Sequence, residues 1–558
     1  MTINNHPPRP PGTPRAATVT VALLAGFLTA CSGEEAPSTA SGGVRPLVVV
    51  GVDSATWDSI DPLLEAGDLP NLRGLIERGL RADLVCLPPL SSPVVWTTIA
   101  TGTFGRIHNV LDHTYPYVPG PKRRVESRQR RVPAIWNLAS HYRRSVGVVG
   151  YYASHPAEKV DGVMVTSKAP EGADGSVYPP EVEELVAKER ERLRDPEERK
   201  RIWRYFLPWD FDPAAAKRDG DPYQRVTEVV QHRIVNRSLF DTFVQRVALA
   251  LAPRRLDLFI IYLRMPDHAS HATWLYYDDS EFEEKPDPGD RELLKDVIPQ
   301  SYRYTDDFLG PLLEEIGPDA NVVILSDHGA GPAVGEWDAG DELSGNHRPN
   351  GIFVAAGPDI RPGTVEGLTT ADVFPTLAAL AGLPISDELP GAVFEEVFRD
   401  GYLRPDRPRR IESYGHIAWE FASTGANVDA EQEREALEQL KALGYLGGDA
   451  DLADSTGEDE VSFWEIEPRL RYRALTGEVF YALMRDDLAA IDRLAELLRE
   501  NDPRFLARVA PQLNRFVNTW SRSFDFALVS DDTLKEFLAR YGNTAVRQPA
   551  GDRPSGSE

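Results

Sequence analysis

The chain has 558 residues, of which 42% are hydrophobic, so it is long enough to bury a large core or to form two or three domains. Its formal net charge of −26 argues against binding to a nucleic-acid polymer or an anionic membrane surface, because both carry negative charge. The two cysteines, Cys31 and Cys86, are too few for a disulfide framework, and Cys86 is expected to be a small buried apolar residue.

Residues 1–30 have the layout of a secretory signal. Arg9 and Arg15 precede an apolar run at 16–30 that is too short to span a bilayer comfortably. The run ends in LTAC, which resembles the lipobox of bacterial lipoproteins, where cleavage leaves the cysteine as the diacylated first residue. The alternative is a plain signal peptide followed by an unrelated cysteine. Residues 31–43 are small and polar, as in a flexible tether, so we expect an exported protein, anchored to a bacterial membrane through Cys31 and facing the periplasm.

The folded part is predicted to begin at residue 44 with a buried strand at 47–52 that ends in Asp53. A region of helical periodicity at 57–79 follows and is closed by Gly79. An aspartate after a strand is more often a helix N-cap than a metal ligand, so Asp53 by itself has both interpretations.

A second candidate site lies where prolines lead into a helix predicted at 94–101. Ser91 or Ser92 falls at the N-terminal end of that helix. A hydroxyl there faces the positive end of the helix dipole and free backbone N–H groups, which suits a phosphate or an activated oxyanion. The alternative is an ordinary serine N-cap.

The segment at 178–241 is predicted to be a helical insertion. Residues 183–206 are densely charged and predict two helices separated at Pro196. The aromatic residues of this segment are candidates to line a substrate cleft, although packing of the insertion onto the core is the favoured alternative; they are Trp203, Tyr205, Phe206 and Trp209.

Two further buried strands lead into metal-competent side chains. The strand at 256–263 precedes Asp267 and His271, which are expected to face each other across a turn and bind one cation, while His268 points away. The strand at 321–325 ends in Asp327-His328, and Gly329 lets the backbone turn away. Alone, this tripeptide would be equally compatible with the start of a turn.

His347, in a predicted loop at 345–351 before a strand at 352–356, completes a set of three aspartates and three histidines. At least four strands alternate with helices, which predicts an α/β fold with a mostly parallel sheet covered by helices on both faces. We expect a catalytic domain at 44–400 and a helical C-terminal region at 401–545, which is a candidate surface for a protein partner. A disordered tail is expected at 546–558.

These residues suit a pair of divalent metal ions. Two such ions need about seven or eight protein ligands, and zinc takes them from carboxylate oxygen and imidazole nitrogen. A natural partition gives one ion Asp267, His271 and His347, and the other Asp53, Asp327, His328 and the Ser92 oxygen. Held ~4 Å apart, the ions would clamp the attacking and leaving oxygens of an in-line phosphoryl displacement, and coordination would lower the pKa of the serine.

With Asp53, Ser92, Asp267, His271, Asp327-His328-Gly329 and His347 in this order, the chain resembles the alkaline phosphatase superfamily. It is most similar to the type I phosphodiesterase/nucleotide pyrophosphatase branch, over about residues 44–398, including GNHRPNGIF and TADVFPTLAALAGLP. The resemblance implies an alkaline phosphatase-like fold, a binuclear zinc site, a small phosphoester substrate and a covalent phosphoenzyme that a metal-bound hydroxide hydrolyses.

The chain departs from this family around the nucleophile. Members commonly have threonine in a Thr-x-Pro context, followed by Asn-His, whereas here Ser91-Ser92-Pro93 is followed by Val94-Val95. Counting back from Gly102 selects Ser92, and counting from the proline selects Ser91. We prefer Ser92, because the length of the helix constrains the geometry more than one proline does.

The same motifs bear on related activities. Sulfatases need x-Pro-x-Arg after the modified residue, and Val95 stands where the arginine belongs, so sulfate esters are not expected. A phosphomonoesterase, a phosphoglycerate-mutase-like enzyme and an inactive relative that binds partners are the remaining alternatives. The complete ligand set favours a metal-dependent phosphoric ester hydrolase, foremost a phosphodiesterase or nucleotide pyrophosphatase.

Overall fold

The computed structural model describes residues 44–118, 122–207, 234, 236–335, 343–422, 433–434, 437, 463–499, 502, 504–524 and 527–542. The predicted signal peptide, Cys31, the tether, Trp209 and the C-terminal tail lie outside the described residues. The chain divides into two units, Met1–Gly43 and Val44–Glu558, and the elements named below belong to the second.

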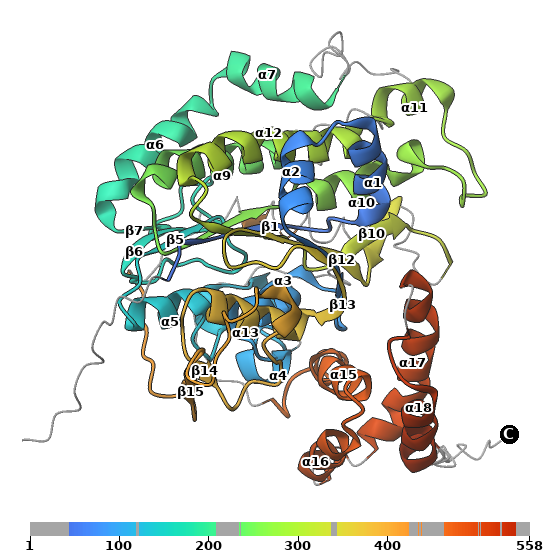
Figure 1. The fold of residues 1–558 in the computed structure, drawn as a ribbon. Helices are drawn as coiled ribbons and strands as arrows, with labels where there is room; N and C mark the ends of the chain where they lie inside the picture. Colours follow the sequence, from blue (N-terminus) through green and yellow to red (C-terminus); the bar gives the residue numbers. More distant parts are fainter. Residues whose placement is uncertain are drawn as a thin grey trace, which may run out of the picture. The chain divides into compact units, whose positions relative to one another are not determined.

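A nine-stranded sheet forms the centre of this unit, in the order β13-β2-β12-β9-β1-β8-β5-β6-β7 (Figure 1). Its strands are β1 (Leu47–Val52), β2 (Leu80–Val85), β5 (Val146–Val149), β6 (Gly162–Val165), β7 (Val177–Tyr178), β8 (Leu258–Leu263), β9 (Asn321–Leu325), β12 (Asn350–Ala356) and β13 (Gly363–Thr369). Strands β12 and β7 pair antiparallel with their neighbours, and the other pairs of this sheet are parallel.

The central strands are continuous apolar runs because helices cover both faces of the sheet (Figure 1). One face carries α1 (Trp57–Ala66), α2 (Pro70–Arg78), α9 (Asn236–Leu251), α10 (Met265–Tyr277) and α12 (Val297–Ile316). The other face carries α3 (Ser92–Thr101), α4 (Gly105–His108), α5 (Ile135–His141) and α13 (Thr370–Leu380). The predicted α/β fold with a mostly parallel, doubly covered sheet is therefore confirmed.

Several local predictions were wrong. The helical region at 57–79 is two helices, because Gly67 takes a left-handed φ of 83° and ends α1. Asp267 and His271 face each other as predicted, with ligand atoms 3.3 Å apart, but they do so on one face of α10 and not across a turn before a helix. His347 lies on β11 (Gly345–Arg348), which pairs with β10 (Gly329–Pro332), and not in a loop.

The insertion contains α6 (Glu183–Arg192) and α7 (Pro196–Phe206), separated near Pro196 as predicted. Tyr205 and Phe206 contact the ring of Tyr304 on α12, with ring centroids 4.9 Å and 5.2 Å away. Trp203 also packs against the central core. These aromatic side chains therefore attach the insertion to the core, which was the favoured alternative.

The C-terminal region contains α15 (Pro468–Met484), α16 (Leu488–Leu498), α17 (Phe505–Trp520) and α18 (Asp531–Phe537). Their apolar side chains share one cluster with Val85, Leu87 and Phe104 of the catalytic part. In addition, the Tyr481 hydroxyl donates a 2.9 Å hydrogen bond to Asp372, the acid in the first turn of α13. The C-terminal helices are thus packed on the catalytic part, although the predicted boundary at residue 400 stays a prediction.

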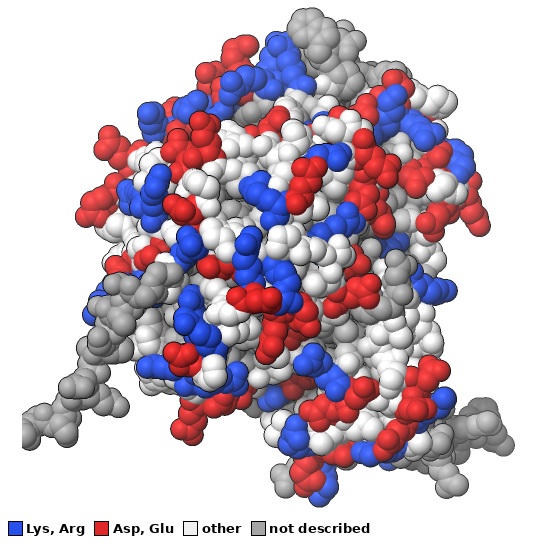
Figure 2. Space-filling view, in the orientation of Figure 1, with Lys and Arg blue, Asp and Glu red and all other residues white. Residues whose placement is uncertain are grey.

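The remaining short elements are α11 (Pro288–Leu294), β3 (Thr114–Tyr115), β4 (Arg123–Arg124), β14 (Ile385–Ser386) and β15 (Arg410–Ile411). Cys86 is fully buried, as expected. Within the described residues, no helix is both long and apolar enough to cross a bilayer. Acidic and basic side chains alternate over the face seen in Figure 2 and do not separate there into a basic tract.

Candidate active site

The structure brings all seven predicted site residues into one buried cluster at the C-terminal ends of β1, β8 and β9. Asp53 follows β1, and Asp327 and His328 follow β9. Asp267 and His271 come from the first two turns of α10, directly after β8. The set is completed by His347 on β11 and Ser92, the first residue of α3.

The first group surrounds Asp267. Its Oδ1 atom lies 3.3 Å from Nε2 of His271 and 3.4 Å from Nε2 of His347. The two Nε2 atoms are only 2.9 Å apart. This arrangement matches the predicted ligand set for one ion, and the structure adds His328 as a further neighbour within ligand distance of Asp267 and His347.

The second group surrounds His328. Its Nε2 atom lies 3.2 Å from Oδ2 of Asp327, 3.6 Å from Oδ1 of Asp53 and 3.3 Å from the Ser92 hydroxyl. The rings of His328 and His347 stack with centroids 3.7 Å apart, so the two groups adjoin. Asp53, Asp327, His328 and Ser92 therefore lie as the predicted second set requires.

Backbone carbonyls fix the orientation of all three imidazoles. Nδ1 of His271 lies 2.8 Å from the carbonyl oxygen of Gly345, and Nδ1 of His347 lies 2.8 Å from that of Leu90. Nδ1 of His328 lies 3.1 Å from the carbonyl oxygen of Gly329. Because a carbonyl only accepts hydrogen bonds, a neutral imidazole here carries its proton on Nδ1 and presents a lone pair on Nε2. Three such lone pairs therefore converge on the carboxylates.

This convergence tests whether the site fits a metal. Two Nε2 atoms at 2.9 Å repel each other when both carry a lone pair, so the contact requires a proton or a metal ion between them. Oδ1 of Asp267 and Oδ2 of Asp327 are buried and accept no hydrogen bond from the described residues. Nitrogen and carboxylate donors of this kind suit zinc or a similar divalent ion, so the residues fit a metal centre.

The pKa values of the site follow from burial and from neighbouring charge. Burial, reinforced by the Asp267 carboxylate, raises the pKa of Asp327 to about 7. Burial alone acts to raise the pKa of Asp267, but His271 and His347 outweigh it and hold that pKa well below its ordinary value. Burial also lowers the pKa of His328 and His347, which keeps both imidazoles neutral at pH 7.

Two aromatic residues that the sequence did not point to hold Asp53 in place. The Tyr262 hydroxyl and the Trp96 indole N–H both donate to Oδ2 of Asp53, and Oδ1 is left facing the site. A Cβ atom on Gly51 would come within 2.6 Å of the Trp96 ring, so only glycine lets α3 lie this close to β1. The sequence held one signal for this contact, which is that Tyr262 carries a hydroxyl near the end of the otherwise apolar strand β8.

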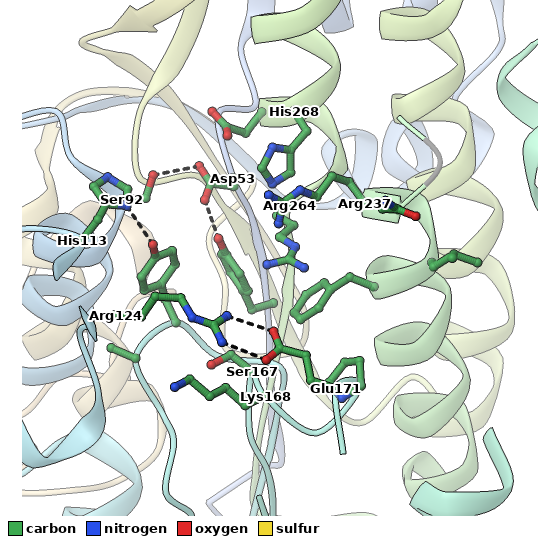
Figure 3. A pocket seen from close by; sticks show the side chains of 18 of the residues that line it. Asp53, Ser92, His113, Arg124, Ser167, Lys168, Glu171, Arg237, Arg264 and His268 are labelled. Carbon is green, nitrogen blue, oxygen red and sulfur yellow. Dashed lines mark hydrogen bonds and ion pairs between the residues drawn. The ribbon is translucent and has the colours of Figure 1, made fainter. Parts of the chain in front are cut away.

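A cavity of about 540 Å³ opens from the cluster and is lined at this end by Asp53 and Ser92 (Figure 3). Asp267 lines the same cavity. Ser91 does not line it, and the Ser91 hydroxyl is buried without a hydrogen-bond partner among the described residues. His268 lines the same cavity but is not in either group of possible metal ligands. The cavity gives a substrate direct access to Ser92.

The family model of type I phosphodiesterase / nucleotide pyrophosphatase matches residues 47–357, a range that contains all seven residues of the cluster. The chain belongs to this family. It is accordingly a phosphoric ester hydrolase of the type I phosphodiesterase/nucleotide pyrophosphatase type, which confirms the resemblance seen in the sequence.

Solved structures give more distant similarities. Murine ectonucleotide pyrophosphatase/phosphodiesterase 5 is 13% identical over 61% of this chain and 95% of its own, with a TM-score of 0.35. Phosphonoacetate hydrolase from Sinorhizobium meliloti is 16% identical over 52% of this chain and 58% of its own, with a TM-score of 0.31. A 2-O GAG sulfatase is 14% identical over 63% of this chain and 73% of its own, with a TM-score of 0.38. None of the curated proteins matches the chain.

Zinc is expected to stabilise the chelator-treated protein in a pH-dependent way. Protons compete with the metal for Asp327 and for the imidazoles, so the rise in Tm on adding Zn²⁺ should be large at about pH 8 and should vanish towards about pH 5. At a zinc concentration of about 100 Kd the gain at the higher pH is about 2.7 kcal/mol. Thermal unfolding with and without Zn²⁺ measures it.

Asp327→Asn should lose most of this stabilisation. The control is Asp319→Asn, since the Asp319 side chain is 89% exposed and lies outside the cluster. A rise in Tm that is equal across this pH range, or that survives in Asp327→Asn, would contradict a metal centre at these residues.

Proposed function

We propose that the enzyme is a phosphodiesterase or nucleotide pyrophosphatase that uses Ser92 as nucleophile and passes through a covalent phosphoserine intermediate. The observation that carries the proposal is the position of the Ser92 hydroxyl. It lies 3.3 Å from Nε2 of His328 and 3.5 Å from Oδ1 of Asp53, and it faces the cavity. A hydroxyl among metal-competent donors at the mouth of a cavity is where an activated nucleophile is needed.

Two divalent ions, with zinc the expected metal, fit the two groups of donors. Asp267, His271 and His347 would hold one ion, and Asp53, Asp327, His328 and the Ser92 oxygen would hold the other. When bound, the ions supply positive charge that lowers the pKa of the serine and stabilises the charge on the transferred phosphoryl group.

The rest of the chemistry belongs to the chain's own residues. Ser92 is the first residue of α3, so its oxygen lies at the positive end of a ten-residue helix, which favours a developing oxyanion. The buried Tyr262 and Trp96 fix Asp53 beside it. Ser91 instead forms the N-cap position with its hydroxyl buried away from the cavity, which supports Ser92 over Ser91.

The size of the cavity favours a diester over a simple phosphomonoester. Beyond Asp53, Ser92 and Asp267, the cavity walls include residues of β8, α6, α9 and the segment around Lys168. The cavity therefore has room for the second substituent of a diester, which stays on the phosphorus. Val95, where a sulfatase would carry arginine, is buried in α3 and brings no charge to the site. A complete set of ligands also speaks against an inactive relative.

Ser92→Ala should lower kcat/KM for a chromogenic phosphodiester by on the order of 10³- to 10⁶-fold, because the nucleophile is lost. Zinc should still raise Tm in this variant, since the other ligands remain. Ser91→Ala is the matched control and should retain turnover. Hydrolysis of bis(p-nitrophenyl) phosphate and p-nitrophenyl phosphate, with zinc and then with chelator, measures these effects.

Three results would count against the proposal. Full activity in Ser92→Ala with loss in Ser91→Ala would move the nucleophile to Ser91. A preference for the monoester would transfer the assignment to a phosphatase. Turnover of neither ester, with or without zinc, would favour a binding protein.

We also propose that the enzyme is exported and anchored to a bacterial membrane through a lipid on Cys31, facing the periplasm. The support is the LTAC sequence and the small, polar segment at 31–43. The C-terminal helices are the candidate surface for a protein partner. Mass spectrometry of the N-terminal peptide from the native host should find a diacylated Cys31, and an unmodified Cys31 would contradict the anchor.

A further inference from the structure

The walls of the active-site cavity are basic outside the end formed by Asp53, Ser92 and Asp267. Six cationic side chains line it, namely Arg124, Lys168, Arg190, Arg194, Arg237 and Arg264. Apart from the site residues Asp53 and Asp267, Glu171 is the one carboxylate among the lining residues. In a chain with a formal net charge of −26, this concentration of positive charge is a local feature of the cavity.

Arg124, Lys168, Arg190 and Arg194 each form an ion pair with a carboxylate. Arg124 forms 2.9 Å ion pairs with Glu171 and Glu433, and Lys168 forms one of 2.9 Å with Glu126. Arg190 on α6 pairs with Glu183 at 3.3 Å, and Arg194, which lies just beyond the end of α6, pairs with Glu191 at 3.0 Å. These four residues already have partners of opposite charge.

Arg264 differs from them. Its guanidinium lies over the ring of Phe240 at 3.5 Å, and its buried Nε atom has no hydrogen-bond partner among the described residues. The nearby carboxylate of Asp241 is used otherwise, because it accepts the backbone N–H groups of Arg264 and Met265 at 3.0 Å and 2.9 Å. The guanidinium of Arg264 is therefore held in the cavity without an ion pair to any carboxylate in the described part of the chain.

Arg237 adds a second guanidinium to the same place. It stands on α9, one turn before Phe240, and both arginine side chains reach towards the middle of the cavity (Figure 3). Burial, together with the charges of Arg264 and Arg124, lowers the pKa of Arg237 to about 9. Two guanidinium groups that disfavour each other's charge form a place where a bound anion is stabilising.

The position of this pair relative to the reacting centre is fixed by the fold. Arg264 directly follows β8 at the N-cap position of α10 and precedes Asp267 by three residues, so one short segment carries both the arginine and a predicted metal ligand. In Figure 3 the two guanidinium groups lie between the Ser92–Asp53 end and the Arg124–Glu171 end of the cavity. An anion bound there would be part of the molecule whose phosphorus lies at Ser92.

We propose that Arg264 and Arg237 bind a second anionic group of the substrate, which stays intact while the ester at Ser92 is hydrolysed. The substrate class is then a phosphodiester or pyrophosphate with a further phosphate or carboxylate on the arm that enters this cavity. Arginine forks match the two oxygens of either group. A neutral or cationic head group in this cavity is disfavoured. The inference rests on the proposed phosphodiesterase function and names the substrate class for the same site.

The test uses three p-nitrophenyl phosphodiesters that share one alkyl arm and end in a hydroxyl, a carboxylate or a phosphate, assayed on the zinc-loaded enzyme. A charge-assisted pair of hydrogen bonds should raise kcat/KM of an anion-ended ester over the hydroxyl-ended ester by about 10- to 100-fold. In Arg264→Gln this ratio should fall towards one, and Arg264→Lys should keep part of it. Comparison of the carboxylate and phosphate arms shows which anion the site prefers.

The matched control is Arg201→Gln on α7, because the Arg201 side chain is 70% exposed and does not line the cavity. It should leave the ratio unchanged. The zinc-dependent rise in Tm establishes that each variant is folded.

The outcomes separate this inference from the function on which it rests. Zinc-dependent hydrolysis of all three esters with equal kcat/KM would keep the phosphodiesterase and overturn the anion site. A ratio that Arg264→Gln leaves intact would overturn the anion site as well. Hydrolysis of none of the three would overturn the proposed function and the anion site with it.

Discussion

The repulsion between donor groups crowded at the ends of three strands is the constraint on which the rest of the structure depends. Three imidazoles turn their Nε2 atoms towards one another and towards three buried aspartates, and two of those nitrogens are 2.9 Å apart. Without a cation this cluster opposes folding, because burial of charge and the alignment of lone pairs both cost free energy. With divalent ions the same features become ligands, so the repulsion is the signature of a site built for metal.

The fold holds this cluster together in spite of its cost. Parallel strands bring their carboxyl ends to one edge, and that edge receives Asp53, Asp267 and Asp327 from segments more than fifty residues apart. Backbone carbonyls then fix the three imidazoles. In the proposed function, substrate recognition comes from elements added around this core. The insertion supplies Arg237 through α9, and on the other side of His347 the C-terminal helices line a second cavity of about 400 Å³ with Tyr472 and Trp520.

The sequence predicted the parts of this arrangement that a local pattern records. Continuous apolar runs identified β1, β8 and β9, and ordered motifs singled out all seven residues that the structure brings together. Strand β2 was not predicted, because its alternating LRADLV pattern includes Arg81 and Asp83. The hairpin that carries His347 was predicted to be a loop. Contacts between distant segments left no periodic signal, so Tyr262, Trp96 and the Arg264–Phe240 pair emerged only from the structure.

The proposed chemistry requires that these seven residues bind two metal ions beside the nucleophile. The most direct measurement is a crystal structure of the zinc-loaded enzyme, with anomalous scattering recorded at the zinc edge. Two zinc peaks are expected, one among Asp267, His271 and His347, and one among Asp53, Asp327, His328 and the Ser92 oxygen. A fully active enzyme without metal at these residues, or with zinc bound only elsewhere, would contradict it.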